Sequence, residues 1–187
     1  MRTLPALATR RATPRDAARV HTVLAEAGDA LAAQGFTNWI PAYPLVNVRR
    51  DIVERAVYVV EARVPEARGA RAPDTGVPAA TVGVFMLGPQ PHRPYEAMAW
   101  AEPDASAQYL NRMAIAPAWH GRGIGSWCLD EAVRLARATG ARALRCDVYE
   151  PNARVRAFYE RAGFVARGTR THGGRTFVCY ERALQTA

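Results

Sequence analysis

The 187-residue sequence contains no lysine, and all 25 of its cationic residues other than histidine are arginine. Its 17 acidic residues leave a formal net charge of +8, a balance that is common in proteins that bind nucleic acid. The arginines are nevertheless spread along the chain without a dense run, and many alternate with apolar residues, as in Arg134-Leu135-Ala136-Arg137. This spacing is typical of a solvated helix face. We therefore expect no nucleic-acid partner.

Cysteine is also scarce, with three widely separated residues at Cys128, Cys146 and Cys179. The number is odd, and no CxxC pair or Cys/His ligand spacing occurs, so the sequence indicates neither a disulfide framework nor a zinc site. Cys146 shares a predicted strand face with Leu144 and Val148, which favours a buried, reduced thiol. We expect no metal cofactor.

Long apolar runs are absent, because no stretch approaches the ~18 residues that a membrane helix needs. The arginine-rich start lacks the apolar region of a secretory signal. Thr13-Pro14-Arg15-Asp16 instead resembles an N-cap followed by proline at the first helical position, so this segment belongs to the fold. We expect a single domain over residues 1–187, a cytoplasmic location and no membrane partner.

The most informative segment is a glycine loop between a strand and a helix. The apolar strand Gln108–Ile115 is followed by His120-Gly121-Arg122-Gly123-Ile124-Gly125, and a helix begins directly afterwards. Alternate glycines let backbone N–H groups crowd around an anion, and the helix N-terminus adds a partial positive charge. The sequence therefore predicts a cradle for a pyrophosphate.

Two other phosphate-binding motifs do not fit this loop. A Walker A loop is excluded because no Gly-Lys-Ser/Thr follows. A dinucleotide fingerprint is excluded because Gly121-x-Gly123-x-x-Ser126 lacks the last glycine. That fingerprint also needs an acidic residue at the end of the next strand, whereas Asp147 lies in the middle of one.

A second motif follows in the order and spacing of the GNAT superfamily of N-acetyltransferases, which this sequence resembles over residues 106–183. His120, Gly123 and Gly125 occupy the family's Gln/Arg-x-x-Gly-x-Gly/Ala pattern, with histidine as a departure at the first position. The second signature is formed by Asn152, Val155, Phe158, Tyr159, Gly163 and Phe164. Val155 departs from the usual Ala or Ser.

The resemblance implies an α/β fold, also described as α+β, in which helices flank a mixed, mostly antiparallel central sheet. The strands at residues 108–115 and 143–149 should run parallel and splay apart, so that a thioester arm enters the gap. The implied reaction is the transfer of an acetyl group from acetyl-CoA to a primary amine of a small molecule or peptide, by direct attack in a ternary complex.

The resemblance also assigns roles to residues. The backbone of Met113, Ala114 and Ile115 should bond the pantetheine arm, and Asn152 should touch it. Tyr159 should protonate the departing thiolate, since a phenol with a pKa of about 10 can supply that proton. The backbone N–H groups of Gly121, Arg122, Gly123, Ile124, Gly125 and Ser126 are expected to hold the cofactor's phosphates. The sequence leaves open whether the His120 side chain donates to a phosphate or ends the preceding turn, and whether the Arg122 side chain contacts a phosphate or is a solvated loop charge.

The acceptor site is expected in two irregular, proline-rich stretches at residues 34–46 and 88–104. Their aromatic residues Trp39, Tyr43, Tyr95 and Trp100 are candidates for the walls of a pocket, which would suit a partly apolar or cationic amine. The general base stays open among carboxylates whose spacing singles none of them out. These are Glu96, Glu102, Asp104, Asp147 and Glu150.

Two other functions agree less well with the sequence than an enzyme does. A sensor or inactive relative that binds acyl-CoA without turnover is disfavoured because Tyr159 accompanies a complete glycine loop. A module directed to RNA is disfavoured because the chain has neither RNP-type aromatic motifs nor a basic run. The sequence leaves open whether the chain forms a homodimer.

Hydrophobic periodicity and turn residues predict the remaining elements. Strands are expected at residues 6–11, 56–62, 80–87, 108–115, 143–149 and 177–183. Helices are expected at residues 16–33, 47–54 and 152–161, in addition to the helix behind the glycine loop. A loop should connect two strands over residues 65–79, and a turn at His172-Gly173-Gly174 should precede the last strand.

Overall fold

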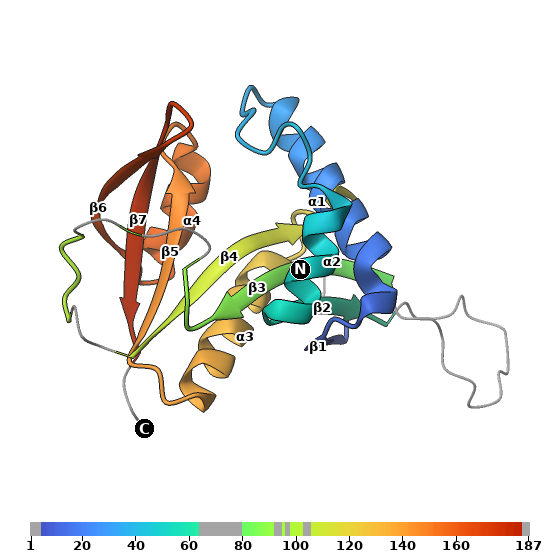
Figure 1. The fold of residues 1–187 in the computed structure, drawn as a ribbon, viewed down its shortest axis with the longest axis horizontal. Coiled ribbons are helices and arrows are strands. Elements are labelled where there is room, and N and C mark those ends of the chain that lie inside the picture. Colours follow the sequence, from blue (N-terminus) through green and yellow to red (C-terminus); the bar gives the residue numbers. More distant parts are fainter. Residues whose placement is uncertain (1–4, 64–79, 92–94, 96–97, 103–105, 185–187) are drawn as a thin grey trace, which may run out of the picture.

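A computed structural model describes residues 5–63, 80–91, 95, 98–102 and 106–184. Within these residues, seven strands form one sheet in the order β1-β2-β3-β4-β5-β7-β6 (Figure 1). The strands are β1 (Leu7–Arg11), β2 (Val57–Ala62), β3 (Ala80–Gly88), β4 (Ala107–Ile115), β5 (Ala143–Tyr149), β6 (Val165–His172) and β7 (Arg175–Ala183). The helices are α1 (Ala17–Ala32), α2 (Leu45–Glu54), α3 (Ile124–Ala138) and α4 (Ala153–Arg161), with short 3-10 turns at Pro14–Asp16 and Pro117–Trp119.

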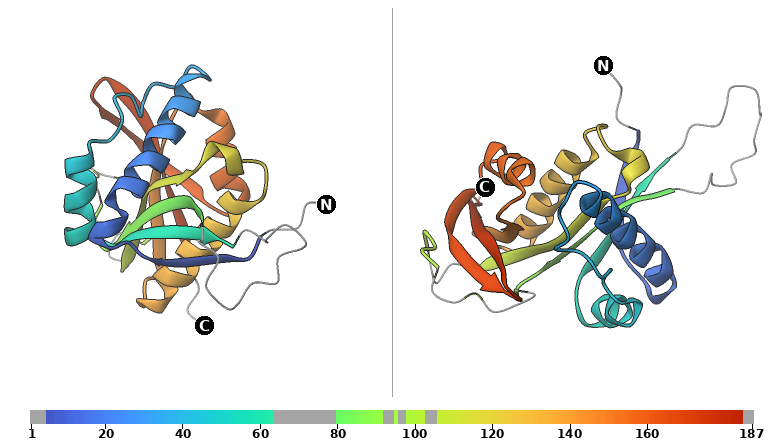
Figure 2. Two further views of the ribbon diagram at one scale, coloured as in Figure 1. Left: turned by 90° about the vertical axis from the view of Figure 1, so that its right-hand side faces the viewer. Right: turned by 90° about the horizontal axis from the view of Figure 1, so that it is seen from above.

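The sheet is divided where β4 meets β5. These two strands run parallel and pair only from Ala107 with Ala143 to Tyr109 with Arg145. All other neighbouring strands are antiparallel. Beyond their short ladder β4 and β5 separate, so the sheet opens into two wings (Figures 1 and 2). The predicted splayed parallel pair is therefore confirmed.

Helices cover both faces of the first wing, formed by β1 to β4 (Figure 2). Helices α1 and α2 pack on one face through residues such as Val20 and Val48, which are fully buried with Val59 of β2. The next residue, Val60, belongs to the opposite core, where it packs with α3. Successive side chains of a strand point to opposite faces, so the adjacent residues Val59 and Val60 pack into the two different hydrophobic cores.

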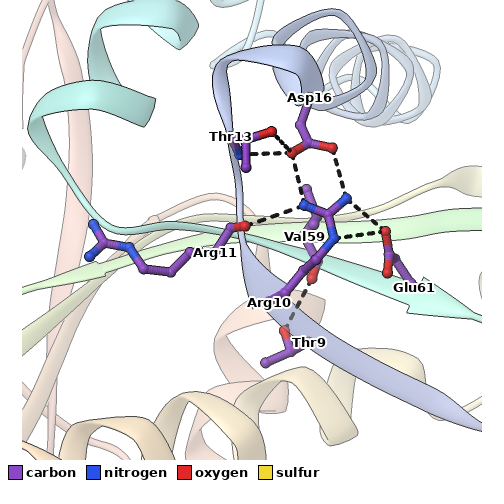
Figure 3. Close-up of polar contacts among 7 residues, drawn as sticks. All are labelled: Thr9, Arg10, Arg11, Thr13, Asp16, Val59 and Glu61. Carbon is purple, nitrogen blue, oxygen red and sulfur yellow. Dashed lines mark hydrogen bonds and ion pairs between the residues drawn. The ribbon is translucent and has the colours of Figure 1, made fainter.

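The start of the chain is attached to this wing by a polar network around Arg10 (Figure 3). The Arg10 guanidinium donates two 2.8 Å hydrogen bonds to the carboxylate of Asp16 and one of 2.8 Å to Glu61 on β2. The Thr13 backbone N–H and hydroxyl also donate to Asp16, over 2.7 and 2.8 Å. Strand β1, the entry to α1 and β2 are thereby fixed together.

Most predicted elements lie within a residue or two of the observed ones. Helix α2 begins at Leu45, two residues before the predicted start, because Pro44 in extended conformation serves as its N-cap. Strand β6 (Val165–His172) was not predicted. It joins β7 through Gly173-Gly174, both at positive φ, in the tight turn that two glycines favour. The predicted loop at 65–79 falls outside the described residues.

Candidate active site

A cavity of about 670 Å³ occupies the opening between β4 and β5. Its walls come from the C-terminal end of α1 and the loop after it, from β4, the glycine loop, the ends of β5 and α4, and the β6–β7 hairpin. Segments that are far apart in sequence therefore converge on one site. It is the place at which the two sequence motifs meet.

The glycine loop forms one end of this cavity in a backbone conformation that L-residues rarely adopt. Gly121 has φ 72° and Gly123 has φ 78°, both in the left-handed region. Gly123 is also the N-cap of α3 and supplies no capping side chain. The first residues of the helix, Ile124, Gly125 and Ser126, border the cavity, and their N–H groups precede the first intrahelical bonds. Unpartnered N–H groups at a helix N-terminus suit a phosphate, so the loop fits a pyrophosphate.

The two polar side chains of the loop have other partners. The Nε2 atom of His120 lies 2.8 Å from the carbonyl oxygen of Ile115, which ties the loop back to the end of β4. The Arg122 guanidinium lies over the Trp119 ring, 4.8 Å from its centroid, and donates to the Ala118 carbonyl. His120 borders the cavity, whereas Arg122 does not.

Strand β4 carries a bulge where it borders the cavity. Val84 pairs with Ala114 and Met86 pairs with Asn111, so two residues of β4 lie opposite one residue of β3. One of the two, Arg112, has φ 48°. Bulges interrupt the ladder and redirect the backbone, and strained residues collect at functional sites. The predicted pantetheine-binding segment, Met113 to Ile115, follows directly and lines the cavity.

Asn152 connects the second motif to the same cavity. Its Oδ1 atom accepts a 3.1 Å hydrogen bond from the Val155 backbone N–H, so it is the N-cap that the sequence predicts for α4. The side chain is buried and borders the cavity. Its amide N–H groups donate no hydrogen bond to the part of the chain that the structure describes, and they are therefore open to a ligand carbonyl.

Tyr159 lies on the cavity wall formed by α4. The ring is 7% exposed and packs edge-on against Phe158 and Phe164, with centroids 5.3 Å away in each case. Burial raises the pKa of its hydroxyl well above 10, and the nearby Cys146 and Asp147 act in the same direction. The phenol therefore keeps its proton. Within the described residues the hydroxyl makes no hydrogen bond, so it is available to a group in the cavity.

The predicted aromatic wall is only partly assembled. Trp39 lines the cavity. Tyr43 lies behind the wall, where its hydroxyl donates to Asp51 and its ring supports the Arg112 guanidinium 3.4 Å from the centroid. Trp100 is not among the lining residues. It packs over the guanidinium of Arg145, which is 4.4 Å from its ring. Sequence order did not reveal that residues 98–102 lie away from the opening.

Among the described candidates for the base, Asp147 alone borders the cavity. One of its oxygens accepts a 2.6 Å hydrogen bond from Arg170, and the other lies 3.3 Å from the Tyr95 hydroxyl. Glu102 is paired with Arg142 on the surface, and Glu150 is exposed. Glu96 and Asp104 lie outside the described residues.

The lining also contains arginines that sequence reasoning did not assign to the site. These are Arg112, Arg154, Arg161, Arg170 and Arg175, and His172 accompanies them. They come from α4 and from three strands, so no local spacing relates them. Arg170 and His172 are two residues apart on β6, so their side chains lie on the same face of the strand. This relationship can be read from the sequence only if residues 165–172 are first predicted to be a strand.

The three cysteines are buried, as expected for Cys146. Burial raises the pKa of Cys128 and of Cys179 to about 12, and that of Cys146 well above 9. All three are therefore thiols at neutral pH and poor nucleophiles. Across the described ranges we find no cluster of three or more His, Cys, Asp or Glu side chains that is arranged to hold a metal. No described helix has both the length and the apolar character to span a membrane.

The splayed strands, the uncapped glycine loop and the Asn152–Phe164 motif form the arrangement that the sequence resemblance predicts for an acyltransferase. Residues 36–164 match the sequence model of the acetyltransferase (GNAT) family, so the chain belongs to that family.

Solved structures of similar fold agree with this assignment. A GNAT-family acetyltransferase from Listeria monocytogenes superposes with a TM-score of 0.70 at 21% identity, covering 95% of both chains. One from Streptococcus agalactiae gives 0.72 at 15% identity, covering 97% of this chain and 98% of that one. The PaiA N-acetyltransferase of Thermoplasma acidophilum, solved in complex with coenzyme A, gives 0.66 at 17% identity, covering 95% and 99%. At these identities the similarity shows the fold.

A curated relative shares part of the sequence. The mycothiol acetyltransferase of Beutenbergia cavernae is 37% identical over 62 residues, which is 33% of this chain. The match spans about a fifth of that relative's length, 21%.

Proposed function

We propose that the protein transfers an acetyl group from acetyl-CoA to a primary amine of a small molecule or peptide. The observation that carries this proposal is a shared cavity, which the uncapped start of α3 and the protonated Tyr159 both border. Membership of the acetyltransferase family and the coenzyme A bound to a protein of similar fold support it.

The chain's residues would hold the cofactor along the two splayed strands. The N–H groups of Gly121 to Ser126 receive the pyrophosphate. The backbone of Met113 to Ile115 and the amide of Asn152 hold the pantetheine arm, and a backbone N–H beside the bulge polarises the acetyl carbonyl. His120 acts by bracing the loop against Ile115, in place of the direct phosphate contact that the sequence left open. Arg122, which lies over Trp119, stays at the rim.

When bound, the thioester supplies an acetyl group activated toward attack by an amine. The amine nitrogen forms the new bond to the carbonyl carbon, the carbon–sulfur bond breaks, and the sulfur leaves as a thiolate. Tyr159 gives that thiolate its proton, because burial keeps the phenol neutral. The proton lost by the amine passes to Asp147, the carboxylate that borders the cavity.

We favour direct transfer in a ternary complex over an acetylated enzyme intermediate. A covalent route needs an activated nucleophile, and the three cysteines are buried with raised pKa values. None of them is among the residues that line the cavity. Both substrates must then be bound together before the acetyl group moves.

Thiol release from acetyl-CoA, measured with a panel of small primary amines and short peptides, tests the function. We expect amine-dependent release with intersecting initial-rate lines, and a product whose mass is increased by one acetyl group. Parallel lines would replace direct attack by a covalent intermediate. Tight acetyl-CoA binding without release by any amine would instead support a sensor or an inactive relative.

A further inference from the structure

The part of the cavity wall formed by β4, β6 and β7 is rich in arginine. Arg112 on β4, Arg170 on β6 and Arg175 on β7 line it, and Asp147 is the carboxylate among the described lining residues. Asp147 is already paired with Arg170 over 2.6 Å. This wall, which we call the arginine wall and define by these three arginines, therefore carries more positive than negative charge.

The arginine wall is held in place before any ligand arrives. Arg170 is 14% exposed and lies between the rings of Phe177 and Tyr95, whose centroids are 5.2 and 5.5 Å from its guanidinium carbon. Arg112 rests on the Tyr43 ring. Guanidinium groups fixed by aromatic rings lose little freedom when they bind, and their forked donors match a carboxylate or a phosphate.

One donor of this wall has no acceptor, and another arginine is bonded only to a neutral group. The Nε of Arg170 is buried and has no hydrogen-bond partner among the described residues. Arg175 donates 3.1 Å to the Thr37 carbonyl, a neutral group, and forms no ion pair within the described residues. A buried donor without a partner is costly, and an anionic ligand would satisfy it.

The cofactor's phosphates do not account for this wall. Two other lining arginines, Arg154 and Arg161, lie on α4. Helix α4 packs beside the glycine loop, where a side-chain carbon at Gly125 would lie 3.8 Å from the Phe158 ring. Arg154 and Arg161 therefore belong to the helix that packs beside the proposed phosphate cradle. The arginine wall belongs to β4, β6 and β7, where the acceptor must bind.

We infer that the acceptor amine carries an anionic group, a carboxylate or a phosphate, which the arginine wall binds. This inference rests on the proposed acetyl transfer and narrows its substrate class. In the proposed complex Arg175 and Arg170 bind the anion directly. Arg112 adds positive charge to the same wall, and Asp147 faces the amine. Trp39 lies two residues after Thr37, whose carbonyl accepts from Arg175, and offers an apolar surface of the same cavity to the body of the ligand.

The test compares amines that differ only in the anion. L-amino acids are measured beside their primary amides, and O-phosphoethanolamine beside ethanolamine. Binding to the protein saturated with coenzyme A is followed by calorimetry, and thiol release from acetyl-CoA is followed separately. We expect at least one acidic member to bind roughly 10- to 100-fold more tightly than its neutral partner, the range of a charged hydrogen bond. Comparison of the amino acid and amide pair with the O-phosphoethanolamine and ethanolamine pair shows whether a carboxylate or a phosphate is preferred.

Variants identify the residue responsible. Arg175→Gln should remove most of the preference for the acidic member, and Arg175→Lys should restore part of it. The affinity for the neutral partner should change less than threefold. Arg49→Gln, which removes an exposed arginine of α2 outside the cavity, should keep the preference. Equal affinity for every acidic and neutral pair, or a preference that persists in both Arg175→Gln and Arg170→Gln, overturns the inference. Preferred binding without thiol release upholds the inference and overturns the proposed reaction.

Discussion

The carboxylate of Asp147 accepts a 2.6 Å hydrogen bond from Nη2 of Arg170, and this pair lies on the cavity wall. Arg170 fixes one oxygen of the carboxylate. The other oxygen lies 3.3 Å from the Tyr95 hydroxyl and therefore has the weaker hydrogen bond. If Asp147 takes the amine proton, Asp147→Asn should lower kcat by roughly 10²–10⁴-fold and leave the Kd for acetyl-CoA nearly unchanged.

A surface carboxylate provides the control for this substitution. Glu102 pairs with Arg142 and is 63% exposed, so Glu102→Gln should leave kcat within a factor of about two. Rates are measured under conditions in which chemistry is limiting. A kcat of Asp147→Asn close to the native value would show that the proton leaves by another route, such as water.

Removal of the Tyr159 hydroxyl tests the general acid. Tyr159→Phe keeps the ring that packs against Phe158 and Phe164, so the fold and the Kd for acetyl-CoA should be preserved. Loss of positioned acid catalysis should lower kcat by roughly 10²–10⁴-fold. A change of less than about threefold, with chemistry limiting, would reduce Tyr159 to a packing residue.

The raised pKa of Tyr159 also predicts the shape of the pH profile. A group whose pKa lies above its usual value stays protonated as the pH rises through that value, here 10.0. The rate should therefore rise with deprotonation of the amine and show no fall near pH 10 caused by loss of the Tyr159 proton. A descending limb of kcat well below pH 10 that disappears in Tyr159→Phe would contradict this.

A matched pair of glycines tests the phosphate cradle. Gly123 and Gly140 have nearly equal φ angles of 78° and 75°, at the start and just beyond the end of α3. Alanine at either position should cost roughly 1–2 kcal/mol of stability, because the left-handed conformation is strained. Only Gly123→Ala should also weaken acetyl-CoA binding, by tenfold or more in calorimetry. Equal affinities in the two variants would remove the loop from the cofactor site.

The part of the fold that follows the glycine loop could be predicted because its signals are local. A glycine run at a helix start and an asparagine N-cap each act within a few residues, and both are found as expected. Strand β6 has no such signal. Five of its residues, from Val165 to His172, are polar or charged, and its place is set by pairing with β7 along the edge of the sheet.

Residues of the acceptor side could not be predicted to the same extent. Trp39 and Trp100 both lie in irregular, proline-rich stretches, yet only the first borders the cavity. Which side of the opening a loop covers depends on contacts between distant segments, such as the packing of Trp100 on Arg145. The arginine wall could not be predicted from the sequence for the same reason, because three different strands contribute one arginine each.

These two tryptophans should therefore respond differently to truncation. Trp39→Ala should raise the KM for the amine, because Trp39 lines the cavity. Trp100→Ala should mainly lower stability, by less than the roughly 3–5 kcal/mol of a fully buried tryptophan, because the ring covers Arg145 and is itself only partly buried. Thermal melts beside the kinetics separate the two effects. A raised amine KM in Trp100→Ala with an unchanged melting temperature would return Trp100 to the acceptor site.

The network around Arg10 predicts how stability depends on acid. The Arg10 guanidinium holds the pKa of Asp16 well below its usual 3.8, and hydrogen bonds from Thr13 add to the effect (Figure 3). The folded state therefore keeps the carboxylate ionised where the unfolded chain takes up a proton. This stabilisation is complete above about pH 4 and is lost as the pH falls from there toward the folded pKa.

Asp16→Asn should accordingly lower the free energy of unfolding at pH 7 by roughly 1–2 kcal/mol, a modest value because Arg10 is partly exposed to solvent. The difference from the native protein should shrink in urea melts at pH 3, because the native protein loses its advantage there. Asp29→Asn changes an exposed carboxylate of α1 and should leave the native pH dependence in place. If Asp16→Asn differed from the native protein by the same amount at both pH values, the ionised Asp16 carboxylate would not be the source of the stabilisation. The loss would then come from contacts of Asp16 that do not depend on its charge.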